Sequence, residues 1–496
     1  MIVPSRSHFL THPFPGPLTL SLPLPHASPF DLYRRMRLPG RPSFLLESGK
    51  GPISIGRYSF SGSDPYMVLS GKDFRYELVT RDGTATYQGN ALAALAGYMK
   101  RSRMPKPDGL PPFWGGAVGW FSYDLVRQFE SLPSLAHDDL NLPDMQFIFV
   151  EMLAAMDHST GMLHLIFSPP PERFLGESRE KLYREGCDRL AELEARLAVP
   201  TVDRPSAVES LSIAPDQSCE RYIEQVRRCQ EYISAGDIYQ ANLSHRFTID
   251  SPTSFDRADE MAAGLYQRLR NMNPSPFSAL LSLDQVRLIS SSPERLVRLN
   301  GCHVETRPIA GTRPRGRNSI EDKWMTDELL ANTKERAEHL MLVDLERNDL
   351  GRICRYGTVR VDEFMTVEQY SHVNHLVSNV TGTLREGLDG FDVIRAVFPG
   401  GTITGVPKIR CMEIIEALEP VRRGPYTGSL GYVSWSGDLD LNIIIRSLVL
   451  AGGRGYLQVG AGIVADSDPA REYRETLLKA EGILKALGGT FTCGSF

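Results

Sequence analysis

The chain lacks the cysteine patterns of disulfide scaffolds and zinc proteins. Its 496 residues contain seven cysteines, scattered from Cys187 to Cys493, and no C-x-x-C pair occurs. This density is far below that of a small secreted domain held together by disulfides. We therefore expect reduced thiols with structural roles.

Long apolar segments and a strong charge excess are also missing. No run approaches the roughly 18 apolar residues of a membrane-spanning helix, and prolines interrupt any signal-peptide core within residues 1–30. The formal net charge is −5, with 23% charged and 42% hydrophobic residues. This balance is typical of a soluble globular protein without a nucleic-acid or membrane partner. We expect a cytoplasmic protein.

Two regions are expected along the chain. Residues 1–205 combine strand-like runs, such as MQFIFVEML at 145–153, with a charged helical stretch at 173–197, and they end in a connector that contains proline and serine. Residues 218–490 open with a helix that Ser218 can cap. Because strands occur in runs as well as between amphipathic helices, the pattern predicts an α+β fold.

Two glycine-rich segments match nucleotide-binding motifs only in part. Gly400 and Gly405 have the spacing of a phosphate-binding P-loop, but Val406 and Pro407 stand where that loop needs Lys and Ser/Thr. GAGIVA at 460–465 fits G-x-G-x-x-A, yet the chain ends too soon for a second strand with a ribose-binding acid. We expect neither a nucleoside triphosphatase nor a Rossmann site. The first segment could present N–H groups to an anion or simply cap a core helix.

The segment ETRPIAGTRPRG at 305–316 combines three arginines, two prolines and a Gly-Thr step around Ala310. Arginine supplies a fixed cationic fork, proline stiffens the chain, and glycine lets backbone N–H groups approach a ligand. The composition is that of an anion-binding cradle. Taken alone, a solvated basic turn explains it as well.

Four carboxylates recur at helical spacing in two distant segments. Glu335 and Glu338 lie three residues apart, as do Glu472 and Glu475, so each pair can project from one helix face, and Lys479 lies one turn beyond Glu475. Such pairs are most often solvated surface groups.

The segment HLMLVDL at 339–345 nevertheless indicates that the first of these helices is largely buried. Two buried carboxylates about 4 Å apart repel by roughly 4 kcal/mol at an effective dielectric near 20, and a divalent cation would relieve that repulsion. All-oxygen ligands favour magnesium over zinc. His372 or His375 in SHVNHL could serve as an acid–base group, although the sequence alone favours a structural histidine.

Several motifs in sequence order resemble those of the chorismate-utilising enzymes. They are GDIYQANLSHRF, NPSPFSALL, SSPERL, ETRPIAGTRPRG, AEHLMLVDLERNDLGR, FPGGTITGVPKIRCMEIIEALEP, GSLGYVSW and GAGIVADSDPAREYRET. The resemblance runs from about residue 218 to 488 and is looser in the first region, where GGAVGWFSYDLVRQFESLP matches best. It implies an α+β fold with two large β-sheets packed as a sandwich, flanking helices, and a magnesium site in the C-terminal half.

The resemblance also implies roles for the acidic pairs. Glu338 and Glu475 match the family's magnesium ligands, which hold the ring carboxylate of chorismate, and Glu335 and Glu472 would support the ion through water. Lys479 would flank the same carboxylate.

Further positions would bind the rest of the substrate. Arg446, Tyr426 and the backbone at Gly462 would hold the enolpyruvyl carboxylate, while Gly311 and Thr312 would meet the hydroxyl-bearing side of the ring. His375 would flank the ring carboxylate beside the metal.

The nucleophile is indicated by Gln240 in YQAN. Family members that add water carry a lysine base at this position, and a neutral amide cannot take a proton from water. Ammonia needs no such base. Because no cysteine lies in a G-x-C-x-G context, the ammonia would come from a separate glutamine amidotransferase subunit.

Two products stay open. The wording of several motifs, YQANLS and NPSPFSALL among them, favours aminodeoxychorismate synthase component I, whose product leads to para-aminobenzoate and folate. Ala310 favours anthranilate synthase component I, because well-known aminodeoxychorismate synthases carry a lysine there. LLESG at 45–49 resembles the tryptophan feedback segment of anthranilate synthases or is a core strand end. A non-catalytic chorismate-binding regulatory protein is the alternative from another class, and the four retained glutamates argue against it.

Overall fold

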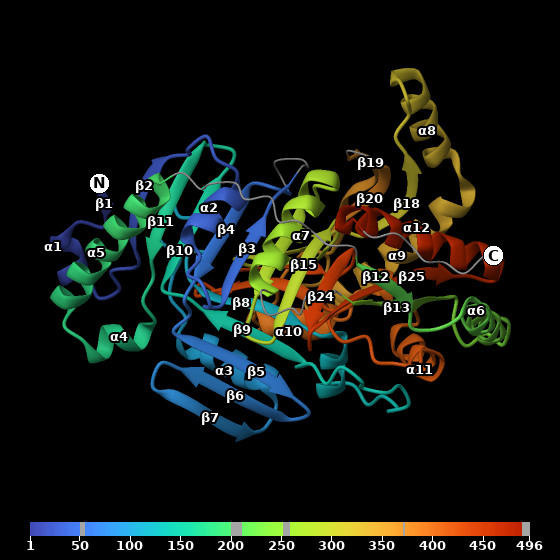
Figure 1. The fold of residues 1–496 in the computed structure, drawn as a ribbon, viewed down its shortest axis with the longest axis horizontal. Coiled ribbons are helices and arrows are strands. Elements are labelled where there is room, and N and C mark those ends of the chain that lie inside the picture. The colour runs from blue at the N-terminus through green and yellow to red at the C-terminus, as the bar shows by residue number, and fades with distance from the viewer. Residues whose placement is uncertain (50–54, 200–210, 251–257, 371–372, 489–496) are drawn as a thin grey trace.

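A computed structural model describes residues 1–49, 55–199, 211–250, 258–370 and 373–488. Two large sheets, almost entirely antiparallel, pack together with helices around them, which confirms the α+β sandwich expected from the sequence (Figure 1). Among the described residues, no helix combines the length and apolar character needed to cross a membrane.

The first sheet has 13 described strands. In spatial order they are β1 (Ile2–Val3), β2 (Leu18–Pro23), β11 (Met162–Phe167), β10 (Met152–Asp157), β4 (Tyr58–Ser63), β3 (Ser43–Glu47), β14 (Phe277–Ser282), β15 (Val286–Ser292), β24 (Ser447–Ala451), β25 (Arg454–Ile463), β13 (Gln240–Asp250) and β12 (Ser212–Pro215), with β21 (Gly405–Val406) paired to β13.

The second sheet has 12 described strands. Their order is β18 (Ile309–Pro314), β20 (Val373–Thr383), β17 (His303–Thr306), β16 (Arg295–Asn300), β23 (Leu439–Ile443), β22 (Ser429–Ser434), β8 (Gly116–Phe121), β9 (Met145–Phe149), β5 (Met67–Lys72), β6 (Arg75–Thr80) and β7 (Gly83–Gln88), with β19 (Arg360–Gln369) paired to β20.

Each sheet contains strands from both expected regions. In the first sheet β3 pairs with β14, placing Leu45 opposite Leu280, and in the second β8 pairs with β22, placing Trp120 opposite Leu430. The regions 1–205 and 218–490 therefore share both sheets and a common hydrophobic core.

Aromatic side chains fill the space between the sheets. Trp114, Trp120 and Trp435 are fully buried there, and every residue of β8 is buried, as expected for a strand covered on both faces. A side chain at Gly119 would meet the β9 backbone, because its Cβ would lie 2.1 Å from the carbonyl oxygen of Gln146. Glycine at this position lets the sheet close tightly.

Twelve α-helices are described. They are α1 (Arg6–Thr11), α2 (Pro29–Met36), α3 (Ala91–Arg101), α4 (Pro171–Gly176), α5 (Arg179–Ala198), α6 (Cys219–Ser234), α7 (Ala258–Met272), α8 (Ser319–Ala331), α9 (Thr333–Gly351), α10 (Gly390–Val397), α11 (Lys408–Leu418) and α12 (Pro469–Leu487). The predicted cap of α6 is confirmed, since the Ser218 side chain accepts a hydrogen bond from the N–H of Arg221 at 3.3 Å. Helix α8 projects from the body in Figure 1.

Two sequence runs that look continuous are divided in the structure. MQFIFVEML forms β9 and β10 with Val150 and Glu151 between them, and the charged stretch at 173–197 is divided between α4 and α5. Glu151 is buried at this junction.

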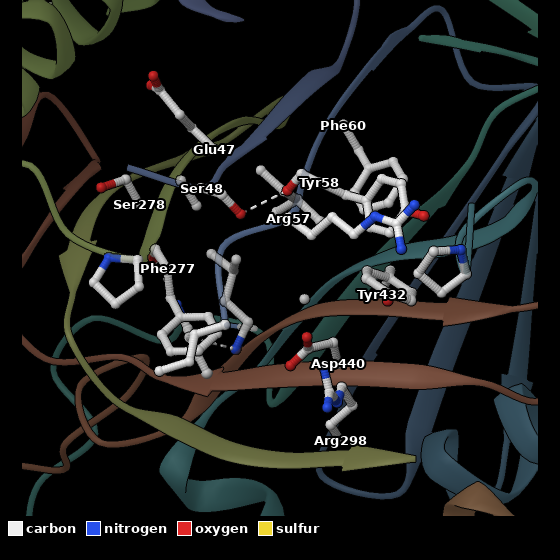
Figure 2. Close-up of a pocket in the computed structure, with 18 of the residues that line it drawn as sticks. Glu47, Ser48, Arg57, Tyr58, Phe60, Phe277, Ser278, Arg298, Tyr432 and Asp440 are labelled. Carbon is white, nitrogen blue, oxygen red and sulfur yellow. Dashed lines mark hydrogen bonds between the residues drawn. The ribbon is translucent and has the colours of Figure 1, made fainter. Parts of the chain in front are cut away.

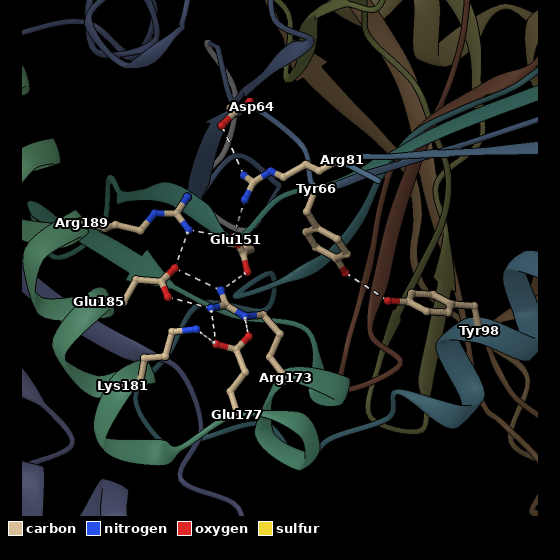
Figure 3. Close-up of polar contacts among 10 residues, drawn as sticks. All are labelled: Asp64, Tyr66, Arg81, Tyr98, Glu151, Arg173, Glu177, Lys181, Glu185 and Arg189. Atoms are coloured by element: carbon tan, nitrogen blue, oxygen red, sulfur yellow. Dashed lines mark hydrogen bonds and ion pairs between the residues drawn. The ribbon is translucent and has the colours of Figure 1, made fainter. Parts of the chain in front are cut away.

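The Glu151 cluster joins this junction to both helices. Arg173 and Arg189 each place a guanidinium nitrogen 2.7 Å from a Glu151 carboxylate oxygen, and Arg173 also pairs with Glu177 and Glu185 (Figure 3). We use the name Glu151 cluster for these five residues. Each of its three carboxylates has a guanidinium partner within the fold, and these ion pairs join α4 and α5 to this end of the sandwich.

Candidate active site

A cavity of ≈ 1240 Å³ opens between α9, α12 and the strands β13, β18 and β25. Ten of the twelve site residues predicted from the sequence line it. They are Gln240, Gly311, Thr312, Glu335, Glu338, Arg446, Gly462, Glu472, Glu475 and Lys479. Residues from distant parts of the chain thus meet in one polar cavity.

Helix α9 carries the first acidic pair into the cavity. Asn332 caps the helix by accepting a hydrogen bond from the N–H of Glu335, so that the following carboxylates project from its first turns. Burial raises the pKa of Glu338, and the carboxylates of Glu335 and Glu475 raise it further. The structure therefore brings the two acidic pairs into electrostatic contact.

Gln240 reaches the same carboxylate from β13. Its Nε2 donates a hydrogen bond to Glu338 Oε1 at 3.1 Å, while its buried Oε1 lacks a partner within the described residues. A Cβ at Gly462 would lie 2.5 Å from Gln240 Nε2. Glycine in the GAGIVA segment thus makes room for the amide that orients Glu338.

Helix α12 carries the second acidic pair. Asp468 caps it by accepting a hydrogen bond from the N–H of Arg471 at 2.7 Å. Burial raises the pKa of Glu472, and the carboxylate of Glu475 adds to the shift. Lys479 Nζ lies 3.0 Å from Glu475 and donates to the carbonyl of Gly460 at 2.9 Å, so the predicted one-turn relation of these residues is present.

The two helices are attached to different sheets. Helix α9 packs on β18 and β20, where His339 Nε2 lies 2.6 Å from Ser378 Oγ, whereas α12 packs on β25 and contacts β13 through a 2.7 Å hydrogen bond between Thr476 Oγ1 and His245 Nε2. Burial lowers the pKa of both histidines to about 4. The acidic pairs consequently face each other from opposite layers of the sandwich.

The donor set fits a hard divalent cation that keeps open positions. Within the described parts of the chain, no three His, Cys, Asp or Glu side chains are grouped to enclose a metal by themselves. Glu338 and Glu475 could therefore supply two carboxylates, with water and substrate oxygens completing the shell, as magnesium prefers. Glu335 is held beside them by Arg313, whose Nη1 lies 2.9 Å from its Oε1.

The basic segment differs from the loop expected from its composition. Residues Ile309–Pro314 form β18, which pairs with β20 and has a register shift between Ala310 and Thr312. Gly311 has φ +70°, and a Cβ there would lie 3.0 Å from Glu335 Oε2. The segment's arginines are ion-paired with carboxylates of Glu328, Glu335, Glu363, Glu368 and Asp322. The prediction that these arginines form an anion-binding cradle is therefore wrong for the described structure. The Gly311–Thr312 step does line the cavity.

Arg446 provides a cation in the wall of the cavity that the acidic pairs also line. It has φ +51°, and burial lowers the pKa of its guanidinium. Glu294 is buried near Arg446, and burial raises its pKa to about 7 although the guanidinium of Arg446 acts in the opposite direction. Glu294 belongs to the motif SSPERL, but its raised pKa depends on burial that the sequence does not show.

His375 lies beside the cavity on β20, whereas His372 lies outside the described residues. It is 2% exposed, its Nδ1 is 2.9 Å from Thr312 Oγ1, and burial lowers its pKa to about 3. A neutral imidazole that orients the Thr312 hydroxyl is what this geometry provides. Its Nε2 has no partner among the described residues.

Tyr426 lies apart from the large cavity. It lines a separate space of ≈ 10 Å³ together with Arg423 and Ser447. Its hydroxyl would be 2.9 Å from a Cβ at Gly460, which places it behind strand β25. The described geometry thus does not bring Tyr426 to the other predicted substrate contacts.

A second cavity of ≈ 470 Å³ lies elsewhere between the sheets (Figure 2). Glu47 and Ser48 from the LLESG segment line it, together with Phe277, Tyr432 and Asp440. The Ser48 hydroxyl donates to the Tyr58 carbonyl at 2.6 Å. LLESG therefore both ends a core strand and borders a cavity.

Comparison with known proteins agrees with this arrangement. A family described as chorismate binding enzyme matches residues 41–485. Anthranilate synthase component 1 of Thermus thermophilus is 45% identical over 466 residues, covering 93% of this chain and 95% of that protein. Aminodeoxychorismate synthase component 1 of Bacillus subtilis is 43% identical over 447 residues, covering 89% and 91%.

Solved structures give the same result for the fold. Anthranilate synthase component I from Streptococcus pneumoniae superposes with a TM-score of 0.75 at 33% identity, covering 86% of this chain and 92% of that one. The menaquinone-specific isochorismate synthase of Escherichia coli has a TM-score of 0.68 at 18% identity and shows the fold alone. From its sequence and its architecture, the chain belongs to the family of chorismate-binding enzymes.

Proposed function

We propose that the protein aminates chorismate with ammonia to give 4-amino-4-deoxychorismate, in a magnesium-dependent reaction. The observation that carries this proposal is the convergence of four glutamates from α9 and α12 on a cavity that also contains Arg446 and Gln240. Such a site has separate places for a cation and for the two carboxylates of the substrate.

The substrate is a dianion, and the cavity contains groups that could receive both of its charges. Arg446 would bind the enolpyruvyl carboxylate, since a charge-assisted hydrogen bond of this type is worth about 1.5–3 kcal/mol. Lys479 and a metal held by Glu338 and Glu475 would receive the ring carboxylate. When bound, magnesium would supply Lewis-acid polarisation of that carboxylate.

Departure of the ring hydroxyl needs a proton. Addition of ammonia forms the new carbon–nitrogen bond and breaks the bond to the hydroxyl, which leaves as water once it takes a proton. The added nitrogen releases a proton as it becomes a neutral amine, and that proton balances the one taken up by the hydroxyl. Glu294, whose pKa burial raises to about 7, lies near Arg446 but does not line the cavity, so it would not contact the substrate directly.

Gln240 favours ammonia over water as the nucleophile. Its amide is committed to donating to Glu338 and offers no base that could activate water. The relatives carry the name component 1, which implies a second component. We infer that a separate glutamine amidotransferase supplies the ammonia to this cytoplasmic enzyme, whose product leads to para-aminobenzoate and folate.

Formation of anthranilate is the second candidate, and two observations favour it. Ala310 lines the cavity and offers no side chain for a covalent intermediate at that position. The cavity beside Glu47 and Ser48 also contains the segment that resembles the tryptophan feedback site. Motif wording elsewhere favours aminodeoxychorismate, so the product decides between the two.

The test incubates the purified chain with chorismate, magnesium chloride and ammonium chloride, followed by product identification. Aminodeoxychorismate, converted to para-aminobenzoate by an added lyase, is the expected product. Anthranilate with pyruvate would establish the second candidate. Chorismate binding without consumption would instead identify a regulatory protein, and omission of magnesium provides the control.

A further inference from the structure

An ion pair joins the two sides of the cavity. Lys334, in the first turn of α9, places its Nζ 3.4 Å from Oδ1 of Asp466, which precedes α12, and both side chains line the cavity. Helix α9 packs on β18 and β20 of one sheet, whereas α12 packs on β25 of the other. The pair therefore links the two layers of the sandwich, and the function proposed above does not use it.

The other paired cations of the cavity stay on one side of it. They are Arg313 with Glu335, Lys479 with Glu475, and Lys485 with Glu481. The first pair connects β18 with α9, which packs on that strand, and the other two lie within α12. Among these four described pairs, only Lys334 and Asp466 bring the α9 side and the α12 side into contact.

The ammonium group of Lys334 lies within electrostatic reach of both acidic pairs. Burial raises the pKa of Glu338 on α9 and of Glu472 on α12, and the charge of Lys334 acts in the opposite direction on both carboxyls. The same acids would surround a divalent ion. Because like charges repel, a lysine turned toward these carboxylates would oppose that ion, and a lysine held away from them would not.

Asp466 is a fixed partner for a flexible lysine. Gln230 of α6 donates hydrogen bonds to the carbonyls of Ala465 and Ser467, the two neighbours of Asp466, at 3.1 and 2.8 Å. The backbone around Asp466 is thereby attached to α6. Lysine, in contrast, carries a compact charge at the end of a flexible four-carbon stem. The position of the Lys334 ammonium is therefore set by Asp466.

We propose that Lys334 is a positioning residue for the divalent ion, held by Asp466 at the solvent-exposed edge of the cavity so that the acidic pairs stay available to the metal. The inference rests on the magnesium site of the proposed function. Both side chains are more than half exposed, at 55% and 73%, so the ammonium lies where solvent reaches it. Without Asp466, the lysine turns inward to Glu338 or Glu472, where it competes with the ion.

Metal affinity is measured by titrating the full chain with manganese(II) chloride and recording the EPR signal of the free ion. Manganese(II) shares the oxygen-ligand preference of magnesium, and chorismate is present without ammonium, so that no amination occurs. Asp466→Asn should raise the dissociation constant about threefold or more, whereas Lys334→Met should lower it about twofold. Magnesium chloride added as a competitor should show the same order of affinities.

The double variant separates a positioning role from the general field of the cavity. If Asp466 acts by holding Lys334, then Asp466→Asn has nothing to release in the Lys334→Met background. The double variant should therefore match Lys334→Met within about 1.5-fold. Additive changes would mean that each charge acts on the ion directly, and they would overturn the positioning role.

Lys485→Met is the matched control, because this lysine also lines the cavity but pairs with Glu481 within α12. Its dissociation constant for manganese should stay within about 1.5-fold of the wild type. A decrease as large as that of Lys334→Met would show that only the total charge of the cavity matters, and it would contradict the proposal. All variants should unfold near the wild-type midpoint, since exposed ion pairs contribute little to stability.

Failure of the proposed function would look different. Equal manganese affinity of the wild type and Glu338→Ala would overturn the metal site, and this inference with it. The predicted order of affinities in a protein that forms no aminated product would support the positioning role and contradict only the proposed amination.

Discussion

The Glu151 cluster and the large cavity both gather carboxylates, but their charge pairing differs. Glu151 has two guanidinium groups at 2.7 Å, and the surrounding glutamates share the same arginines (Figure 3). Glu338 has a neutral amide as its hydrogen-bond partner, and its electrostatic neighbours include two further glutamates. One region is complete as folded, while the other is arranged to be completed by a ligand.

The comparison suggests a physical way to separate structural acids from functional ones. A buried ion pair gains little net stability, but removing one partner leaves an uncompensated charge and is costly. Where a carboxylate has no charged partner within the fold, the native state already bears the electrostatic cost of that charge. A bound cation or a proton must then offset this cost. Four consequences follow, from the largest expected effect to the smallest.

Removing an acid from the cavity should abolish activity without harming the fold. Glu338→Ala and Glu475→Ala should each lower kcat/KM by ~10³-fold or more, since loss of a metal ligand removes several kcal/mol of transition-state stabilisation. Steady-state kinetics and thermal unfolding are the measurements. Glu481→Ala, on the outer part of α12, is the matched control. Near-normal activity of either cavity variant would contradict the assigned ligands.

Removing a cation from the Glu151 cluster should instead lower stability and leave activity unchanged. Arg173→Met leaves Glu151, Glu177 and Glu185 without their shared partner and should lower the free energy of unfolding by about 3 kcal/mol. Chemical denaturation measures the loss. Ammonium-dependent kcat and KM should stay unchanged in the folded protein, and a selective loss of activity would show that the two regions are linked.

Arg446 is the cavity cation proposed to bind the enolpyruvyl carboxylate, and a conservative substitution tests that role. Arg446→Lys keeps the charge but loses the planar fork and should lower kcat/KM for chorismate by about 10- to 100-fold, corresponding to roughly 1.5–3 kcal/mol. Arginine and lysine tolerate the positive φ of this position equally, so the variant should fold. An unchanged value would remove Arg446 from substrate binding.

The two regions should also respond to pH with opposite sign. Glu294 and Glu346 have folded-state pKa values raised to about 7 and about 8, so between their unfolded pKa and these values the native state binds more protons, and stability falls as pH rises. In the Glu151 cluster, Arg173 lowers the pKa of Glu177 to about 2, so its contribution is present above its unfolded pKa and is lost as pH falls.

Denaturant unfolding at several pH values checks this difference. The wild type should lose stability between pH 5 and 8, and Glu346→Gln should lose less, by about 1 kcal/mol or more. Identical pH dependence in the two proteins would show that Glu346 is ionised in both states across this range.

Sequence reasoning found what depends on local spacing. The i, i+3 pairs at 335/338 and 472/475 and the Ser218 cap follow from periodicity and short-range hydrogen bonds, and they are confirmed. Family motifs then placed ten of the twelve site residues in one cavity.

Other features depend on contacts between distant segments, which spacing does not encode. Tyr426 lies behind β25, where Gly460 leaves room for its hydroxyl. Glu346 lies near Gly401, which follows it by more than fifty residues in the sequence. MQFIFVEML reads as one apolar run, but Glu151 turns the chain there because arginines from later helices neutralise it. Burial and charge pairing of this kind become visible only in three dimensions.

The attachment of α9 and α12 to opposite sheets has a consequence for evolution and engineering. Substrate affinity depends on how the two layers are aligned, so a substitution deep in the aromatic interior, at Trp435 for example, could loosen ligand capture long before it threatens folding. Substitutions at interior positions far from the cavity should therefore change turnover. A screen for altered turnover should recover these positions alongside residues that touch the substrate.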